Sequence, residues 1–356
     1  MNFYDYDLRP IEATGPELGS TDNKFVIDQV AYDIKSLFSD NQTAMIILTN
    51  PPHWGGVEQL SNTGIDYVVY NSSDHPDKVE NRHLYDISTK PVIKLHSEFD
   101  SEYYYPFWFM ASRHCTSSYP DLTSIDTLKQ HYVEYLCGKT RVSRIYVALS
   151  LANRNYFNRI KINWCMLKFT DSVNEFIDTL VTHNHSSVRF EFPDFTAGVE
   201  RFIGLHKDFT PLPLSIDGYA KVFSAKHGLS DAYLQIVSES VPEHNSKFVS
   251  EKIWKPLRAG QLFLIQGGPG TIGLLRQAGF DVFDDYIDHA RYDNEPDWQT
   301  RTDLMLSVLD DIYSNIETIY FSTTARRQAN IDRFNSQDLV DWALRNVTAQ
   351  IHNLAK

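Results

Sequence analysis

Cysteine is scarce in this sequence, and the few cysteines are widely spaced. Cys115, Cys137 and Cys165 are the three cysteines among 356 residues, and no two of them form a Cys-X-X-Cys pair. An odd number of widely spaced cysteines excludes a disulfide framework and a cysteine-ligated zinc site. We therefore expect free thiols and a reducing compartment.

Long hydrophobic runs are absent as well. Runs such as residues 44–48 and 262–265 are far shorter than the roughly 20 apolar residues that cross a bilayer. The first residues, from Met1 to Asp7, lack the basic segment and apolar stretch of a signal peptide. We expect a cytoplasmic protein without a membrane span.

Basic residues are too few to suggest a polynucleotide as the main ligand. The chain has 33 Lys and Arg against 46 Asp and Glu, a net charge of −13, whereas binding a nucleic-acid backbone needs clustered cations. A local basic cleft for one diphosphate is still compatible with this balance. The 42% of apolar residues indicates a globular protein, and the length predicts two domains.

Sequence motifs of several other enzyme classes are missing. No Gly-X-Ser-X-Gly elbow of a hydrolase occurs, and no Asp-X-Asp metal motif follows a strand that the sequence predicts. His183 and His185 could share one face of a strand, but no third metal ligand accompanies them. We expect no metal and no cofactor other than a co-substrate.

The first part of the chain alternates the patterns of strands and helices. Short apolar runs bounded by turn residues predict buried parallel strands at 44–48, 67–70 and 91–95. Helical spacing occurs over 25–38 and over 125–136, where Gly138 would end the helix. This alternation predicts a doubly wound α/β domain over residues 1–140.

The second part repeats the alternation and ends in helices. We expect strands at 144–149, 188–192, 233–237 and 262–265. We expect helices at 158–167, at 250–258 before a stop at Gly260, and from Trp298 onward, with Ser336 as the N-cap of the last helix. The prediction is an α/β protein with two Rossmann-like domains facing a cleft, residues 1–140 and 141–330, and a helical tail over 331–356.

The most informative segment lies between the strands at 233–237 and 262–265. The first of these runs into Ser238-Glu239-Ser240, and Ser250-Glu251-Lys252 opens the following helix. Glu251 suits a helix start, but a cation such as Lys252 opposes the helix dipole there, which suggests a bound anion.

Further cations and glycines fall near the same kind of loop. Arg154, Arg159 and Lys255 lie close to predicted helix starts, where they could neutralise a diphosphate. Gly267-Gly268-Pro269-Gly270-Thr271 follows the strand at 262–265 and would let a ligand approach the backbone. We interpret it as neither a Walker loop, because Gly-Lys-Ser/Thr is missing, nor a Gly-X-Gly-X-X-Gly loop.

These segments resemble the donor-binding motif of the α1,3-fucosyltransferase family, and still more that of its viral and bacterial relatives. The similarity lies in Ser238-Glu239-Ser240 with Phe248 to Trp254, and in Ser150 to Arg154 with Arg159. It implies a GT-B fold, a GDP-sugar donor bound by the second domain, and inversion without a metal. Ser240 replaces the family's Asn and Ser250 its Thr.

The resemblance also implies roles for single residues. Arg159 and Lys252 would hold the diphosphate, and Glu239 and Glu251 would contact the ribose or base. The expected donor-binding residues are Arg154, Arg159, Glu239, Ser240, Ser250, Glu251, Lys252, Lys255 and Gly268.

Transfer to a hydroxyl also needs a base, which should follow a strand of the first domain. We expect Glu98, because the family's base is a Glu in the corresponding region; the alternatives are His53, Asp74, His75 and His96. The leading hypothesis is an inverting, metal-independent glycosyltransferase that acts on a glycan hydroxyl. The alternatives are a non-catalytic nucleotide- or sugar-binding module and a viral DNA-base glycosyltransferase, which the acidic balance disfavours.

Overall fold

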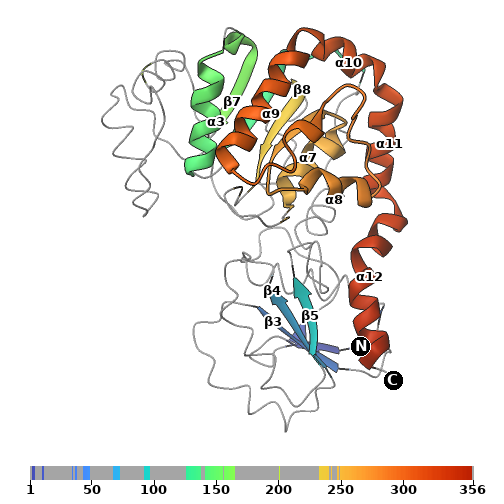
Figure 1. Cartoon of the computed structure of the whole chain (residues 1–356). Helices are drawn as coiled ribbons and strands as arrows, with labels where there is room; N and C mark the ends of the chain where they lie inside the picture. Colours follow the sequence, from blue (N-terminus) through green and yellow to red (C-terminus); the bar gives the residue numbers. More distant parts are fainter. Residues whose placement is uncertain are drawn as a thin grey trace.

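The computed structural model describes two separate sheets and the helices around the second one (Figure 1). The residues described are 2–4, 10–11, 34, 37, 43–48, 67–72, 92–96, 126–137, 141–154, 156–164, 200, 232–239, 242, 247 and 249–354. The protein is a mixed α/β structure, as the sequence predicts.

The first sheet has five strands in the order β2-β1-β3-β4-β5. All neighbouring pairs are parallel except β1 and β2. The predicted strands at 44–48, 67–70 and 91–95 are confirmed as β3, β4 and β5. The strands are β1 Asn2–Tyr4, β2 Pro10–Ile11, β3 Thr43–Leu48, β4 Tyr67–Ser72 and β5 Val92–His96.

The second sheet has four strands, all parallel, in the order β7-β6-β8-β9. Every residue of β8 and β9 is buried, which explains why their sequences are nearly continuous apolar runs. The strands are β6 His131–Cys137, β7 Ile160–Trp164, β8 Ala232–Ser238 and β9 Leu262–Gln266.

Helices follow the strands of the second sheet and make up the C-terminal part of the chain. The α-helices are α3 Val142–Ala152, α7 Glu251–Ala259, α8 Thr271–Gln277, α9 Trp298–Ile312, α10 Ile316–Ser322, α11 Thr324–Asn335 and α12 Gln337–Leu354. The 3-10 turns are η4 Phe157–Arg159, η6 His289–Arg291 and η7 Tyr313–Asn315. Helices α7 and α9 pack against β9, and α11 packs against α7.

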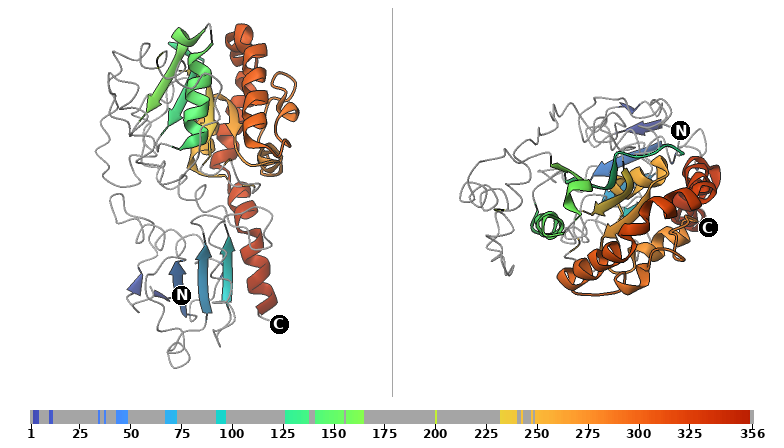
Figure 2. Two further views of the ribbon diagram at one scale, coloured as in Figure 1. Left: turned by 60° about the vertical axis from the view of Figure 1, so that its left-hand side comes forward. Right: turned by 90° about the horizontal axis from the view of Figure 1, so that it is seen from above.

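The last helix links the two parts of the structure. α12 contacts α11 at one end and lies along β5 of the first sheet further on (Figures 1 and 2). Its start matches the prediction, because the Ser336 hydroxyl accepts the N–H of Leu339 at 3.3 Å. The predicted stop of α7 is also confirmed: Gly260 is its C-cap in a left-handed conformation, with φ 60°.

Three elements between residues 125 and 167 differ from the sequence prediction. The predicted helix over 125–136 is instead strand β6, the predicted strand over 144–149 is helix α3, and the predicted helix over 158–167 is strand β7. α3 is buried on nearly all sides, and its residues 145–149 form a continuous apolar run without the periodicity of an amphipathic helix. Such a run is compatible with either structure.

Because these three elements differ from the prediction, the loops at the edges of the second sheet consist of other residues than the sequence predicts. β6 pairs with β7 and β8, although it precedes residue 140, where the sequence places the boundary between the two domains. The strand-to-helix connection therefore lies between Cys137 and Val142, and not around Ser150 to Asn158. Among the residues that the structure describes, no helix is long and apolar enough to span a membrane.

Candidate functional site

The carboxyl ends of β8 and β9 bring the two most informative sequence segments to one edge of the sheet. Ser238, the last residue of β8, is paired in register with Gln266, the last residue of β9. Glu239 follows the first strand and Gly267 follows the second. In open parallel sheets, ligands bind outside this edge.

A chain of hydrogen bonds joins the two halves of the sequence motif. The Glu239 carboxylate accepts the Ser250 N–H through Oε1 at 3.0 Å and the Ser250 hydroxyl proton through Oε2. The Ser250 hydroxyl in turn accepts the N–H of Lys252 at 3.3 Å and its Nζ–H at 2.9 Å. Residues eleven positions apart are thus in direct contact at the start of α7.

This chain fixes how α7 begins. Ser250 is the N-cap of the helix, and both it and Glu239 are only 1% exposed. A buried carboxylate requires donors, and Ser250 supplies two. Glu239 therefore orients the first turn of α7 and directs its carboxylate to Ser250. The Lys252 ammonium group, tied to the same hydroxyl, lies on the half-buried side of that turn.

A second polar network lies beneath the edge, between β6, β8 and β9. The Ser238 hydroxyl donates to Gln266 Oε1 at 2.6 Å and lies 3.0 Å from the hydroxyl of Tyr135. Gln266 Nε2 donates to Thr302 Oγ1 on α9 at 2.8 Å. Arg144, buried on α3, donates to the carbonyls of Ser238 and Glu239. These bonds connect the strand ends to the helices on either side.

The glycine-rich loop after β9 is hydrogen-bonded to a carboxylate of the protein itself, that of Asp293. Its residues from Gly268 to Gly273 do meet the Gly-X-Gly-X-X-Gly spacing of dinucleotide-binding loops, so the interpretation of this segment as a loop without that motif is wrong. In the structure, however, Asp293 Oδ1 accepts the N–H of Ile272 at 3.0 Å, and its carbonyl accepts the N–H of Gly270 at 2.7 Å. A carboxylate of the chain thus occupies the start of α8, where a phosphate would bind.

One further observation separates this loop from a dinucleotide site. A Cβ at Gly273 would meet no atom within 4 Å, so its glycine is not needed for close packing between helix and strand. Gly270 does need to be glycine, because its φ is +79°, a conformation that L side chains rarely adopt. A Cβ there would lie 2.6 Å from Cε of the flexible Lys247 side chain. Lys247, which the sequence analysis also missed, thus packs its side chain against the loop.

Burial has the largest effect on the pKa of Asp293. Desolvation raises the pKa of this carboxyl, while the N–H groups of Ile272 and Gly273 and the positive charges of Arg276 and Arg301 act in the opposite direction. The net shift is upward, so the loop holds its carboxylate at some electrostatic cost.

The structure does not bring Arg154 and Arg159 to this edge. Arg159 immediately precedes β7, whose first residue Ile160 pairs with Val133 near the start of β6. Its guanidinium lies 4.7 Å from the ring centroid of Tyr132. Arg154 lies after α3 and pairs with Asp310, with Nε 2.8 Å from Oδ1. Both arginines are at the amino ends of the strands, roughly 20 Å from the opposite edge for strands of this length.

The predicted contact between a diphosphate, Arg159 and Lys252 together is therefore not supported by the geometry. The difference arises because the sequence predicts a strand where the structure has helix α3. A loop that follows a strand would have carried Arg154 and Arg159 to the carboxyl edge. The structure places Glu239, Ser250, Lys252 and Gly268 at that edge, with Lys255 half-buried one turn further along α7.

Other predicted site residues lie outside the described part of the chain. Ser240 and Glu98 are among them, as are His53, Asp74 and His75, together with His183 and His185. Glu251 is the first residue of α7, but its side chain is not described. Within the described ranges, no group of three His, Cys, Asp or Glu side chains could hold a metal ion.

Comparisons with known proteins provide little further information. The sequence matches no family model and no curated protein. Among solved structures, it is similar to the DNA-modifying enzyme β-glucosyltransferase, studied in the presence and absence of its substrate uridine diphosphoglucose. The identity is 10%, the match covers 95% of this chain and 98% of that chain, and the TM-score is 0.38. A TM-score of this size is too low to establish a shared fold or activity.

Proposed function

We propose that this chain is a glycosyltransferase that binds a nucleotide-diphosphate sugar at the carboxyl edge of its four-stranded sheet. The hydrogen-bond chain from Glu239 through Ser250 to Lys252 carries the proposal. It joins the two halves of a motif that resembles the donor site of α1,3-fucosyltransferases, at the edge where parallel sheets bind ligands.

The chemistry of transfer assigns a role to Lys252. When the bond between sugar and diphosphate breaks, negative charge grows on the leaving diphosphate and must be neutralised. A lysine ammonium group can serve as a point charge for phosphate, and the N–H groups at the start of α7 add favourable dipoles. We propose that Lys252 binds the diphosphate and that Glu251, beside it, binds the ribose. Glu239 supports both by holding the first turn of α7.

The remaining parts of the mechanism come from the resemblance. It favours a GDP-sugar, inversion without a metal, and an acceptor hydroxyl of a glycan. Glu98 is proposed as the base; it lies two residues after the carboxyl end of β5, where His96 ends the strand. Transfer would move the sugar from the diphosphate oxygen to the acceptor oxygen, while the hydroxyl proton passes to the base.

Two variants distinguish this site from one in which Arg159 and Lys252 bind the diphosphate together. Lys252→Ala should abolish the binding of the nucleoside diphosphate that the wild-type protein binds, as measured by isothermal titration calorimetry. Arg159→Ala should leave the affinity unchanged, because Arg159 lies at the other edge of the sheet. Unchanged affinity in Lys252→Ala, or lost affinity in Arg159→Ala, would contradict the proposed placement.

A further inference from the structure

Arg301 lies beneath the carboxyl edge and binds three different loops. Its Nε–H donates to the carbonyl of Gly267 at 2.8 Å, its Nη1 to the carbonyl of Glu295 and its Nη2 to that of Pro242. The side chain is 1% exposed and projects from the first turns of α9. The loop after β8, the loop after β9 and the segment before α9 therefore meet at one guanidinium group.

Only arginine offers the donors that this arrangement requires. The guanidinium carries five N–H groups in a rigid plane, whereas a lysine has three donors on one rotating atom. Buried carbonyls that lose their donors are costly, so the three loops would shift to find other partners if Arg301 were replaced. This one side chain therefore helps to set the relative position of the two segments that flank the candidate site.

The connection to the candidate site is direct on both sides. Pro242 lies in the loop that separates Glu239 from Ser250, and Gly267 begins the loop that contains Gly268. The distance between the Lys252 ammonium group and the glycine-rich loop is therefore set partly by Arg301. The guanidinium also contributes a fixed positive charge below the edge, which lowers the pKa of the Asp293 carboxyl against the effect of burial.

We propose that Arg301 is a positioning residue of the donor site: by holding the loop after β8 against the loop after β9, it keeps the start of α7, and with it Lys252, in the position that binds the donor's diphosphate. The inference rests on the proposed function, because it concerns the same site. It adds a buried residue that neither the motif nor the resemblance includes.

A second buried arginine provides a matched control. Arg327 is 0% exposed and also clamps backbone, since its Nε–H donates to the carbonyl of Tyr320 at 3.0 Å and its Nη1 to that of Gly260 at 2.7 Å. Gly260 lies between α7 and β9, at the amino edge of the sheet. Replacing Arg327 should therefore destabilise the fold in the same way without changing the carboxyl edge.

The test compares Arg301→Lys with Arg327→Lys. Calorimetry measures the Kd of the nucleoside diphosphate that the wild-type protein binds and the Kd of the matching nucleoside, below the Tm of each variant. A loss of folded protein changes both constants by the same factor, so their ratio reports only how well the phosphates are bound. We expect Arg301→Lys to lower the ratio of nucleoside Kd to diphosphate Kd by about tenfold or more, since small displacements of a binding group have effects of this size. We expect Arg327→Lys to leave it unchanged.

The outcomes are distinguishable. If the wild-type protein binds a diphosphate and Arg301→Lys keeps the ratio, the role of Arg301 is wrong while the proposed function stands. An equal fall of the Kd ratio in Arg327→Lys would also contradict the proposed role of Arg301. Failure of the wild-type protein to bind any nucleoside diphosphate would overturn both proposals.

A measurement on the wild-type protein covers the case in which Arg301→Lys does not fold. The ¹⁵N resonance of Arg301 Nε should shift when the diphosphate binds and stay in place when the nucleoside binds, whereas that of Arg327 Nε should not respond to either. An Arg301 resonance that does not respond to the diphosphate would contradict the proposal.

Discussion

Asp293 holds the start of α8 through the N–H of Ile272, which it accepts at 3.0 Å. A carboxylate from a loop twenty-one residues further along the chain thus takes the place that a ligand phosphate occupies in dinucleotide-binding loops. The diphosphate that we propose as the ligand must therefore rely on the loop after β8 and on α7, where Lys252 lies.

Replacing this carboxylate tests whether it acts as a cap. Asp293→Ala should lower the free energy of unfolding by about 1 kcal/mol, because the N–H of Ile272 loses its acceptor. Asp293→Asn should cost less, since an amide oxygen can accept the same bond without the desolvation that raises the pKa of Asp293. Urea denaturation at neutral pH measures both. Equal losses in the two variants would contradict the capping role.

The N-cap of α7 should tolerate a second hydroxyl residue. Ser250→Ala removes the acceptor of the Lys252 N–H and the hydroxyl donor of Glu239, and should cost about 1–2 kcal/mol of stability. Ser250→Thr keeps the hydroxyl and should be closer to the wild-type protein in stability and in diphosphate affinity. Chemical denaturation and calorimetry give the two quantities; a Thr variant as impaired as the Ala variant would show that the hydroxyl is not what matters.

His289 should make stability depend on pH. The ring is fully buried; Nδ1 lies 2.7 Å from the Tyr292 hydroxyl, and Nε2 lies 2.9 Å from the carbonyl of Val282. Burial lowers the pKa of His289 from 6.5 to about 4, against the hydrogen bond to Val282, which acts in the opposite direction. Between these values the unfolded chain binds a proton that the folded protein does not, so stability falls as pH drops from 6.5 towards 4.

The size of this effect is measurable. A shift of this extent corresponds to about 3 kcal/mol between neutral pH and pH 4. Urea denaturation across the range should show a smaller fall in His289→Asn than in the wild-type protein. Identical pH profiles would contradict the buried neutral histidine.

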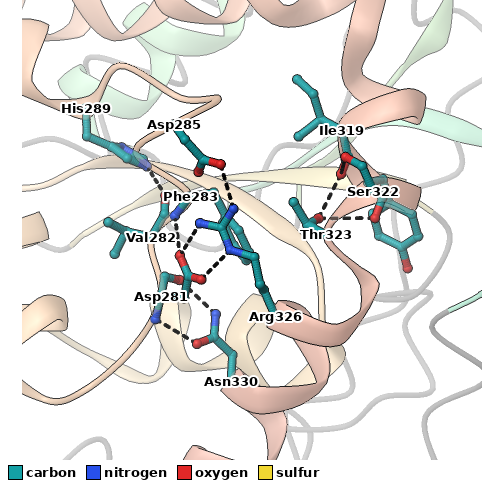
Figure 3. A network of polar contacts seen from close by, with 11 residues as sticks. Asp281, Val282, Phe283, Asp285, His289, Ile319, Ser322, Thr323, Arg326 and Asn330 are labelled. Atoms are coloured by element: carbon teal, nitrogen blue, oxygen red, sulfur yellow. Dashed lines mark hydrogen bonds and ion pairs between the residues drawn. The ribbon is translucent and has the colours of Figure 1, made fainter.

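The loop after α8 is held by α11 through two kinds of contact (Figure 3). Asn330 accepts the N–H of Asp281 and donates to its carbonyl, both at 2.8 Å, and is buried. Arg326 pairs with Asp281 and Asp285, but its side chain is 35% exposed. Solvent-exposed ion pairs contribute little, whereas buried backbone groups without partners are costly.

Replacing the neutral Asn330 should therefore lower the free energy of unfolding more than replacing the charged Arg326. Asn330→Ala should cost about 2 kcal/mol. Arg326→Met should cost less than about 1 kcal/mol, and less still at high salt. Thermal and urea denaturation of the pair checks the order, and a larger loss in Arg326→Met would contradict it.

Sequence patterns predicted most of the elements that border the site. The apolar runs of β8 and β9, the start of α7 and the stop at Gly260 could be predicted, because each combines a strong local pattern with a clear boundary residue. Helix α3 could not, since burial on nearly all sides removes the periodicity that distinguishes a helix from a strand.

That single ambiguity determined what could be predicted of the site. A strand over 144–149 would place Arg159 beside Lys252, whereas helix α3 places Arg159 at the far edge of the sheet. Arg301 gave no sequence signal either. Its role depends on three backbone carbonyls from distant loops. Every residue type has such a carbonyl, so the sequence does not show which ones Arg301 binds.

The central claim is that the carboxyl edge of the four-stranded sheet binds a nucleotide-diphosphate sugar without a metal. A thermal-shift panel of GDP, UDP, CDP, TDP and ADP, with and without EDTA, tests it most directly, because a ligand that binds only the folded protein raises its Tm. We predict stabilisation by one diphosphate, with GDP favoured, that EDTA does not change and that Lys252→Ala abolishes. No shift with any of the five, or a shift that persists in Lys252→Ala, would contradict the claim.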